Sequence, residues 1–407
     1  MSSRVLGVAV GLALLLSACS SAPPTAAGPS PAPATPTPSP SVESPTPTAT
    51  PSPPASPSPE ATASPTPAAT APAQSAEQLA GRRVIYSYPG LTPPESLLRA
   101  IRAGQAAGVV FFGENVSGPA QLTAVVDQLR AAQRQSPVKE PLLLMTDQEG
   151  GKIKRLPGAP VPSAKQIGHS PDPTAAASTA GTGAGKNLTG LGLNVNLAPV
   201  LDVYDKPGNF IDATQRSYSS NPRTVANLGT AFIKAQQKAG VAATAKHFPG
   251  LGSAPAGQNT DLGPVTLPLS LTMLRTVDEV PYPPAIAAGV RMIMLSWAIY
   301  PALDPKNPAG LSPTVVQQEL RGRLGYQGVT ITDAIEAGAL NAYGNAGQRS
   351  VLAAAAGMDL LLCSARDTAQ GDQAVTALAA ALDAGTLDRP GFTAAADRVT
   401  ALRAGLH

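Results

Sequence analysis

The sequence predicts an α/β protein, a single (β/α)8 TIM-type barrel preceded by a signal peptide and a disordered Pro-rich linker. Three observations support this prediction. The composition changes abruptly near residue 75, short apolar runs then alternate eight times with Ala-rich stretches of helical character, and several of these runs end in charged residues. The expected boundaries are residues 1–18 for the signal peptide, 19–74 for the linker and 75–407 for the barrel.

Residues 1–18 have the features of a secretory signal peptide. Arg4 provides a positive start, an apolar run too short to span a bilayer follows, and small residues precede Cys19. The segment Leu16-Ser17-Ala18-Cys19 resembles a bacterial lipobox, which implies cleavage before Cys19 and lipidation of that cysteine. Acyl chains there would anchor the protein to the cell membrane on its extracytoplasmic face. The alternative is an ordinary secretory signal with an incidental cysteine.

Residues 19–74 are expected to form a disordered linker. The segment consists largely of Pro, Ala, Ser and Thr and contains no Lys or Arg. A chain of this composition cannot bury enough apolar surface to fold, and its prolines favour extended polyproline II structure. The remaining residues, 75–407, are sufficient for one well-buried core. We therefore expect one folded domain, monomeric, at the end of a semi-rigid spacer.

Eight apolar, β-rich runs are predicted to form the strands of the barrel. They are Arg83 to Tyr88, Val109 to Phe112, Leu142 to Thr146, Val195 to Leu201, Val241 to Lys246, Met292 to Ser296, Val329 to Thr332 and Leu360 to Cys363. Helices are predicted between them, at Ala120 to Gln135, at Thr224 to Gly240 and at Pro313 to Leu324, with Gly240 and Gly325 in position to end the last two. Strict alternation favours a closed barrel of parallel strands, and an open doubly wound sheet is the alternative.

Charged residues at the ends of the predicted strands indicate where a functional site would lie. Asp147 and Glu149, Asp202, Lys246 and His247, and Asp333 all occupy such positions. In a β/α barrel the carboxyl ends of the strands meet at one face, so these side chains should converge on one pocket.

The composition argues against several other functions. The net charge of +3 is small and no basic run is present, which disfavours nucleic acid as a partner. The sequence has no glycine-rich phosphate-binding loop. Its three histidines, His169, His247 and His407, are too few for a His-rich zinc site. No metal or organic cofactor is implied.

Five motifs in these positions resemble glycoside hydrolase family 3, and within it the single-domain β-N-acetylhexosaminidases that trim cell-wall fragments. They follow the family order over residues 80 to 400. The motifs are Thr146-Asp-Gln-Glu-Gly-Gly151 with Arg155 after it, Asn196-Leu-Ala-Pro-Val-Leu-Asp202, Gln215-Arg-Ser-Tyr218, Lys246-His-Phe-Pro-Gly250 and Gly328-Val-Thr-Ile-Thr-Asp333.

The resemblance implies a role for each matching residue. Asp333 is implied to be the nucleophile that forms a covalent glycosyl intermediate, although an Asp after a strand can also simply cap a helix. The implied sugar-binding residues are Asp147, Arg155, Arg216, Lys246 and His247. The alternative for each of these is a salt-bridge ring that closes the barrel mouth. Glu149 could equally hold Arg155 or a backbone amide, and Asp202 could be purely structural.

The expected proton donor of the family is missing from this sequence. Family members of this type carry an Asp-Ser-His segment in the loop after the Lys-His-Phe-Pro-Gly motif, whereas residues 250–261 contain no histidine, so the usual His-Asp pair is not expected. Asn259-Thr260-Asp261 lies at the corresponding place, which makes Asp261 the candidate acid/base. Its pKa would have to be raised by burial or by Asp333. The alternative is that Asp261 is a turn residue in a mobile loop.

The sequence therefore predicts a retaining exo-β-N-acetylglucosaminidase that removes terminal β-linked GlcNAc from small carbohydrates, among them peptidoglycan-derived fragments. Two carboxylates and water suffice for this reaction. The alternatives are a β-glucosidase or glycoside phosphorylase on the same fold, and a sugar-binding lipoprotein that has lost turnover.

Overall fold

The computed structural model describes residues 74–406. The predicted signal peptide, the predicted lipidation site Cys19, the linker up to residue 73 and His407 lie outside the described residues. Between Gln74 and Leu406, none of the helices combines the length and the apolar character needed to cross a membrane.

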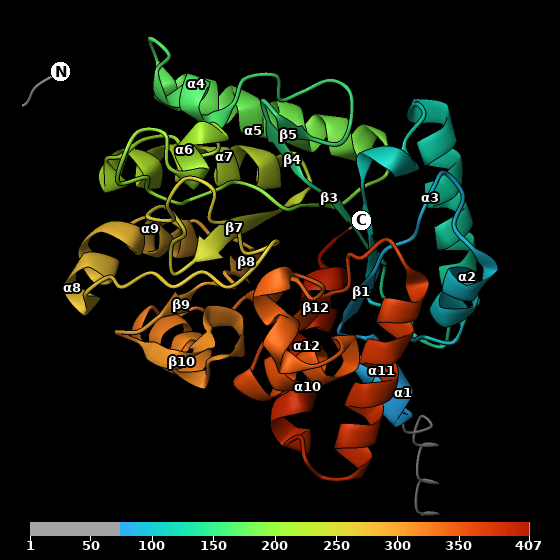
Figure 1. Ribbon diagram of the computed structural model, residues 1–407. Coiled ribbons are helices and arrows are strands. Elements are labelled where there is room, and N and C mark those ends of the chain that lie inside the picture. Colours follow the sequence, from blue (N-terminus) through green and yellow to red (C-terminus); the bar gives the residue numbers. More distant parts are fainter. Residues whose placement is uncertain (1–73, 407) are drawn as a thin grey trace, which may run out of the picture. The chain divides into compact units, whose positions relative to one another are not determined.

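Eight parallel strands close into a barrel in the order β1-β12-β11-β8-β7-β6-β3-β2 (Figure 1). They are β1 (Val84–Tyr86), β2 (Gly108–Phe111), β3 (Leu143–Thr146), β6 (Val195–Asn196), β7 (Ala242–Phe248), β8 (Met292–Leu295), β11 (Val329–Ala334) and β12 (Leu360–Leu362). Because β1 pairs with both β2 and β12, the sheet has no open edge. The predicted (β/α)8 barrel is confirmed, and the open doubly wound sheet is excluded.

Helices fill the connections and surround the barrel (Figure 1). The α-helices are α1 (Ala76–Gly81), α2 (Glu95–Arg102), α3 (Pro119–Arg134), α4 (Ala164–Gly168), α5 (Pro173–Gly190), α6 (Phe210–Ala213), α7 (Pro222–Lys238), α8 (Leu271–Met273), α9 (Tyr282–Ala287), α10 (Ala346–Ala356), α11 (Thr368–Asp383) and α12 (Arg389–Ala404). Helices with other hydrogen-bond patterns are η1 (Gly113–Asn115), η2 (Leu274–Asp278), η3 (Ala309–Leu311), η4 (Thr314–Arg323) and η5 (Gly338–Tyr343). Two hairpins lie outside the barrel, β4 (Gln148–Gly150) with β5 (Ile153–Lys154) and β9 (Ile299–Tyr300) with β10 (Asp304–Pro308).

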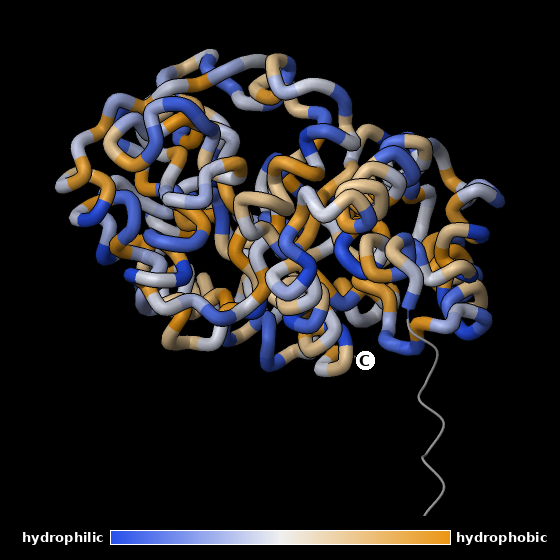
Figure 2. The backbone as a smooth tube through the Cα atoms, turned by 90° about the horizontal axis from the view of Figure 1, so that it is seen from below, coloured by the Kyte–Doolittle hydropathy of each residue, from blue (hydrophilic) through white to orange (hydrophobic). Residues whose placement is uncertain are grey.

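Helix α7 illustrates how the sequence sets these boundaries. The Asn221 side chain accepts hydrogen bonds from two free N–H groups of the first turn, and Pro222 stands where no N–H is needed. The helix ends at Lys238, and Gly240 shortly after it has a φ of 89°, in the left-handed region that favours glycine. Figure 2 shows hydrophobic and hydrophilic stretches alternating along the helices, as expected when one face of each helix is buried.

Two predicted elements differ from the observed ones. The strand predicted at Val195 to Leu201 forms regular ladder pairs only at Val195–Asn196, because Pro199 has no N–H to donate. The helix predicted at Pro313 to Leu324 is present as η4 but has the wider π pattern, in which the Leu324 N–H donates to the Glu319 carbonyl at 3.1 Å.

The core has two layers, one inside the barrel and one between the strands and the surrounding helices. Alternate residues along each strand face the two layers; Ile85, for example, packs inside the barrel, and its neighbours Val84 and Tyr86 pack outside. Helix α12 crosses the amino-terminal end of the barrel and inserts Val399 and Leu402 into the inner layer. The barrel is therefore filled and closed at this end, which we call the floor.

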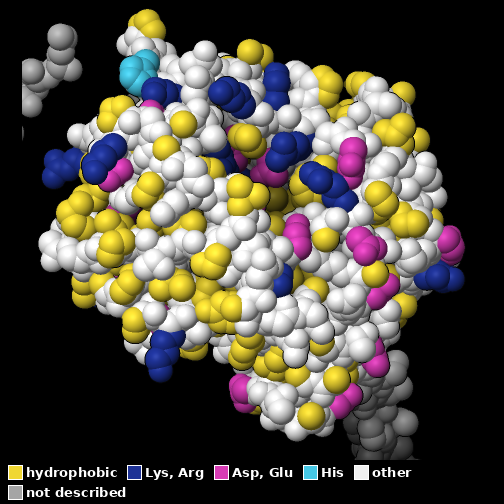
Figure 3. Space-filling model, in the orientation of Figure 1, with side chains coloured by type: hydrophobic (Ala, Val, Ile, Leu, Met, Phe, Trp, Pro, Cys, Tyr) yellow, Lys and Arg dark blue, Asp and Glu magenta, His cyan; other side chains and the backbone are white. Residues whose placement is uncertain are grey.

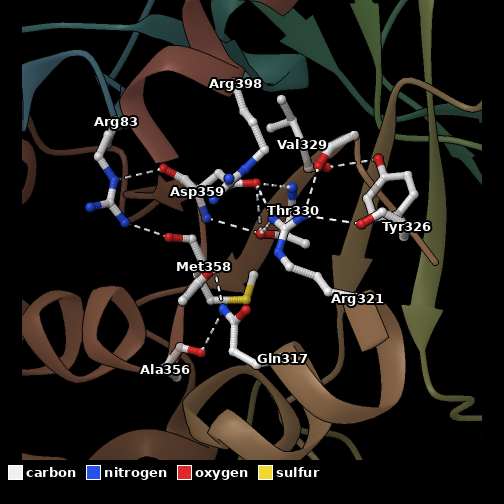
Figure 4. A network of polar contacts seen from close by, with 12 residues as sticks. Arg83, Gln317, Arg321, Tyr326, Val329, Thr330, Ala356, Met358, Asp359 and Arg398 are labelled. Carbon is white, nitrogen blue, oxygen red and sulfur yellow. Dashed lines mark hydrogen bonds and ion pairs between the residues drawn. The ribbon is translucent and has the colours of Figure 1, made fainter. Parts of the chain in front are cut away.

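A buried ionic network centred on Asp359 reinforces the floor (Figure 4). This carboxylate precedes β12, is fully buried, and accepts hydrogen bonds from Arg321 of η4 at 2.6 Å and from Arg398 of α12 at 2.8 Å. It also accepts from the Thr330 N–H at 2.8 Å. Arg83 donates to the neighbouring carbonyls of Met358 and Asp359. The network joins five chain segments at the end of the barrel away from the carboxyl ends of the strands.

Candidate active site

A cavity of about 480 Å³ opens at the carboxyl ends of the barrel strands. Figure 3 shows a hollow in this face of the molecule, with Lys, Arg, Asp and Glu side chains gathered around it. All seven predicted site residues in the described part of the chain line the cavity, namely Asp147, Arg155, Arg216, Lys246, His247, Asp261 and Asp333. The sequence therefore identified one contiguous site.

Four of these cavity residues take part in a cluster of ion pairs. Lys246 projects from β7, and its Nζ lies 2.8 Å from both Asp147 Oδ1 and Glu149 Oε1. Arg216 donates two hydrogen bonds to Glu149, at 2.9 and 2.7 Å. The Arg155 Nη2 atom lies farther from its partner, at 3.7 Å from Asp147 Oδ2. Glu149 thus holds Arg216 and Lys246, rather than Arg155 as one sequence interpretation suggested.

The cluster keeps its groups charged although they are buried. Burial alone would raise the pKa of Glu149, but Arg216 and Lys246 outweigh it and lower the pKa to about 2. Burial would likewise lower the pKa of Lys246, and Asp147 and Glu149 reverse this effect, so that the pKa is raised. Fixed, ionised groups of both signs can donate to and accept from the hydroxyl groups of a sugar in defined directions.

The β4–β5 hairpin positions Arg155 and closes one side of the cavity. Gln148 is buried, and its side-chain oxygen accepts hydrogen bonds from the N–H groups of Arg155 at 3.1 Å and Leu156 at 3.0 Å. The backbone N–H of Arg155 also donates to the Asp147 carbonyl at 3.2 Å. The tight turn uses Gly150 and Gly151, which both have positive φ values. These contacts fix the direction in which Arg155 leaves the hairpin.

His247 is held by Asp202. The His247 ring Nδ1 lies 2.7 Å from Asp202 Oδ2, and Asp202 Oδ1 accepts from the N–H groups of His247 and Leu251 at 3.2 and 2.7 Å. Asp202 is fully buried and its pKa is lowered, because His247 and these N–H groups outweigh burial. Residues 250–261 contain no histidine, and a different histidine-aspartate contact, that of His247 with Asp202, is present in the site. Asp202 orients the ring so that Nε2 faces Arg216, at 3.5 Å.

Asp333 lies on β11 and reaches the cavity from the side opposite β3. Its Oδ1 accepts a hydrogen bond from the Ala334 N–H at 2.8 Å. Burial raises the pKa of Asp333, a positive charge on His247 opposes this, and the charge of Asp261 raises it further. The carboxylate has no counter-ion in hydrogen-bonding contact among residues 74–406. It is thus available for chemistry rather than neutralised in an ion pair.

Asp261 belongs to a loop that is attached to the loop carrying Asp333. The carbonyl oxygens of Thr260 and Asp261 accept hydrogen bonds from the N–H groups of Ala339 and Gly338, at 2.9 and 2.8 Å. The Asn259 side chain accepts from the Asp261 N–H at 2.9 Å, and Thr260 is buried. These contacts fix the loop and place the exposed Asp261 side chain at the mouth of the cavity. A second carboxylate thus lines the same cavity as Asp333.

Other cavity residues were not identified from the sequence. Phe112 follows β2, Glu336 follows β11, and Ser364 and Arg366 follow β12. Phe112 is the last residue of a predicted strand and the others stand shortly beyond one, which is the same signal that identified Asp147 and Asp333. Glu336 differs from Asp333 because both of its oxygens are occupied, accepting from Ser364 Oγ at 2.7 Å and from Gln370 Nε2 at 3.1 Å. Glu336 thus serves to hold the loop after β12.

In the described part of the chain, no group of three or more His, Cys, Asp or Glu side chains is arranged to hold a metal ion. The arrangement instead provides a carboxylate without a counter-ion, a second carboxylate across the cavity mouth, and a rigid ionic cluster beside them. Two such carboxylates can act as nucleophile and proton donor at an acetal carbon, and the cluster can bind the attached ring.

The chain is similar to known glycoside hydrolases over most of its length. Residues 78–402 match the family described as the glycosyl hydrolase family 3 N-terminal domain. An uncharacterized secreted glycosyl hydrolase of Arthroderma benhamiae is 51% identical over 329 residues, which cover 80% of this chain and 93% of that protein. A β-hexosaminidase of Pseudomonas aeruginosa is 33% identical over 276 residues, covering 66% of this chain and 79% of that protein.

A solved structure has a similar fold. The glycoside hydrolase family 3 β-N-acetylglucosaminidase from Paenibacillus sp. str. FPU-7 superimposes with a TM-score of 0.77 at 35% sequence identity. The superposition covers 82% of this chain but 63% of that one, so the present chain spans less than two thirds of this relative.

Proposed function

This chain belongs to glycosyl hydrolase family 3 and is a glycoside hydrolase, and from this premise we propose that it releases terminal β-linked N-acetylglucosamine with retention of configuration. One observation carries the proposal: Asp333, without a counter-ion, and Asp261 line a single cavity together with the ionic cluster around Lys246. The names of a curated relative and of a solved structure, a β-hexosaminidase and a β-N-acetylglucosaminidase, support the choice of sugar.

The terminal sugar is proposed to bind against the ionic cluster. Asp147, Arg155, Arg216, Lys246 and His247 would contact its hydroxyl groups. Their mutual ion pairs fix the side chains before the sugar arrives, so less conformational entropy is lost on binding. This binding would hold the anomeric carbon beside Asp333.

Asp333 is proposed to be the nucleophile. Its carboxylate attacks the anomeric carbon, the bond from that carbon to the leaving oxygen breaks, and a glycosyl ester of Asp333 forms. Asp261 would give its proton to the leaving oxygen in this step. In the second step a water molecule would give a proton to Asp261 and attack the same carbon, which releases the sugar and restores Asp333.

Chromogenic substrates test this assignment. Residues 74–407 should hydrolyse aryl β-N-acetylglucosaminide faster than aryl β-glucoside, and Asp333→Ala should reduce kcat by on the order of 10³-fold or more. A mechanism-based inhibitor should add mass to the peptide that contains Asp333. Equal activity of the wild type and Asp333→Ala would contradict the proposal. Faster turnover of the β-glucoside, or sugar 1-phosphate as the product in phosphate buffer, would favour the alternative activities.

The acid/base role of Asp261 has a separate signature. Asp261→Asn should slow hydrolysis of substrates with poor leaving groups much more than hydrolysis of activated aryl substrates, since only the former need protonation. His247→Gln is the matched comparison, because loss of a sugar contact should slow both kinds of substrate to a similar extent. The opposite pattern would assign proton donation to His247.

The proposed source of the substrate is peptidoglycan, reached by a protein anchored to the membrane through Cys19. The supporting geometry is at the floor, where Arg82 donates to Gln74 Oε1 at 2.8 Å and also contacts Thr400 of α12. A tether ahead of Gln74 would therefore leave the domain at the end away from the cavity. Cys19→Ser should move the full-length protein from the membrane fraction to the soluble fraction; unchanged fractionation would contradict lipid anchoring.

A further inference from the structure

One part of the cavity wall is not used by the proposed sugar site. Phe112, which follows β2, and Arg366, which follows β12, line the cavity on the strands that flank β1. The sugar-binding side chains come instead mainly from β3, β7 and the loop between β6 and α7. Arg366 follows β12, the strand next to β11 with Asp333, whereas the ionic cluster is built on β3 and β7.

Arg366 is held in an unusual backbone conformation. Its φ of 59° lies in the left-handed region, which costs free energy for a residue other than glycine. The buried Ser87 accepts from the Arg366 N–H at 2.8 Å, and Gln370 accepts from the Ala365 N–H at 2.9 Å. Gln370 in turn donates to Glu336, which also accepts from Ser364. Hydrogen bonds to Ser87, Gln370 and Glu336 therefore fix the loop after β12, in which Arg366 lines the cavity.

The guanidinium group of Arg366 is oriented but only weakly neutralised. Its central carbon lies 4.5 Å from the centre of the Phe112 ring, and the Arg155 guanidinium lies 6.0 Å from the same ring. Arg366 Nε lies 3.3 Å from Glu114, but both side chains are about half exposed, so this pair contributes little. Neither Nη group of Arg366 makes a hydrogen bond within residues 74–406. A planar fork of donors without a hydrogen-bond partner among residues 74–406 thus belongs to a residue that lines the cavity.

We propose that Arg366, oriented by Phe112, determines specificity for a leaving group that carries a carboxylate. Guanidinium groups with free Nη donors bind carboxylates through two parallel hydrogen bonds, and a fixed position beside Asp333 suits the group on the far side of the scissile bond. This inference rests on the proposed glycosidase function and adds the chemical class of the leaving group, an acidic sugar or another carboxylate-bearing aglycone.

A matched pair of substrates tests the inference. The two β-N-acetylglucosaminides would carry 4-(carboxymethyl)phenyl and 4-(carbamoylmethyl)phenyl leaving groups, which differ in charge but little in leaving ability. The measured quantity is the ratio of kcat/KM for the acidic substrate to kcat/KM for the neutral one. Arg366→Gln should lower this ratio about five- to tenfold, and raised salt should lower the wild-type ratio. Glu114→Gln should raise the ratio, because it removes the competing carboxylate.

The control is Arg389→Gln, the same change at an exposed arginine of the floor, where the ratio should equal that of the wild type. An unchanged ratio in Arg366→Gln, with both substrates hydrolysed, would overturn the inference and leave the glycosidase function intact. Absence of hydrolysis of both substrates by the wild type would overturn the glycosidase function and the inference together. If Arg366→Gln proves unstable, Arg366→Gly removes the side chain while suiting the left-handed backbone, and the same fall in the ratio is expected.

Discussion

The charge on Asp333 is set by its burial and by three charged residues from two other parts of the chain. Burial raises its pKa, His247 and Lys246 lower it, and Asp261 raises it. The net direction is upward from the ordinary value of 3.8. Because a nucleophilic carboxylate must be ionised, the reaction rate should fall as the pH drops through this raised pKa.

The pH dependence of Asp333 labelling should therefore respond to Asp261. Asp261→Asn removes a negative neighbour, so the pKa of Asp333 should fall and the acidic limb of the profile should move to lower pH. The measurement is the rate of inactivation by a fluorosugar with a strongly activated leaving group, because that step needs little protonation. An acidic limb at the same or a higher pH in Asp261→Asn would contradict this coupling.

A second carboxyl group, that of Asp278, affects stability rather than catalysis. Asp278 ends η2 behind Gly250, is 1% exposed, and neither of its oxygens has a hydrogen-bond partner within residues 74–406. Burial, followed by the charges of Asp202 and Asp205, raises its pKa to about 8. Between about pH 4 and 8 the folded state thus retains a proton that the unfolded chain loses, so stability falls as the pH rises through this range.

Replacing Asp278 with Asn should remove this pH dependence. Asp278→Asn should be close to the wild type in stability near pH 4 and more stable near pH 8, by on the order of 5 kcal/mol, since a shift of about four pKa units at about 1.4 kcal/mol each separates the folded and unfolded states. Urea unfolding at the two pH values measures the difference. A stability difference that is the same at both values would show that Asp278 is ionised in the folded protein.

At the scale of elements, the site depends on how two loops meet. The loop after β7 carries Asp261, the loop after β11 follows Asp333, and they contact through the N–H groups of Gly338 and Ala339. A Cβ at Gly338 would lie 2.5 Å from the carbonyl carbon of Leu262, closer than real contacts allow. The glycine therefore permits the close approach that places both carboxylates at one cavity.

Gly338→Ala should separate the two loops. We expect kcat to fall about tenfold or more on substrates with poor leaving groups, and less on activated ones, because the displaced group is Asp261. Gly263→Ala is the matched control in the same loop, since a Cβ there meets nothing within 4 Å. Equal kinetics of the two variants would mean that the loop contact does not position Asp261.

The elements themselves were largely predictable from the sequence, whereas the loop geometry was not. Strand alternation located all eight barrel strands, because each is a short buried run between helices with local end signals such as Asn221 and Gly240. The interruption of the ladder at Pro199 is a local signal that was overlooked, whereas the π pattern of η4 depends on neighbouring segments and was missed for that reason. The roles of Glu336 and Arg366 were also missed. They depend on hydrogen bonds to Ser364 and Ser87, respectively, which are distant from them in the sequence.

Across the whole molecule, the cavity and the stabilising ionic network lie at opposite ends of the barrel. The cavity is built on the carboxyl ends of the strands, and Asp359 precedes β12 at the floor. Removing the charge of Asp359 would leave Arg321 and Arg398 without their shared partner. Changes at the floor should therefore affect folding and leave the chemistry of the folded molecules unaltered.

Asp359→Asn should destabilise the domain by about 3 to 5 kcal/mol, the range found when one partner of a buried ion pair is removed. The kcat of the folded fraction should equal that of the wild type. Asp397→Asn is the matched control on α12, because Asp397 is mostly exposed and 3.7 Å from Arg82, so its loss should cost less than about 1 kcal/mol. A kcat effect of Asp359→Asn in fully folded protein would refute this separation of the two ends.

The pairing of β1 with β12 also has a consequence for the order of events during synthesis. Val84 pairs with Leu361, so the first strand of the barrel cannot complete its pairing until the last strand has been synthesised. Helix α12, which fills the floor, is synthesised after both strands. Until about residue 404 has left the ribosome, the nascent chain has two unpaired sheet edges and an unfilled barrel interior. It cannot reach its native structure before that point. The barrel can therefore close only when nearly the whole domain has been synthesised, so folding of this domain is a late event rather than a stepwise one.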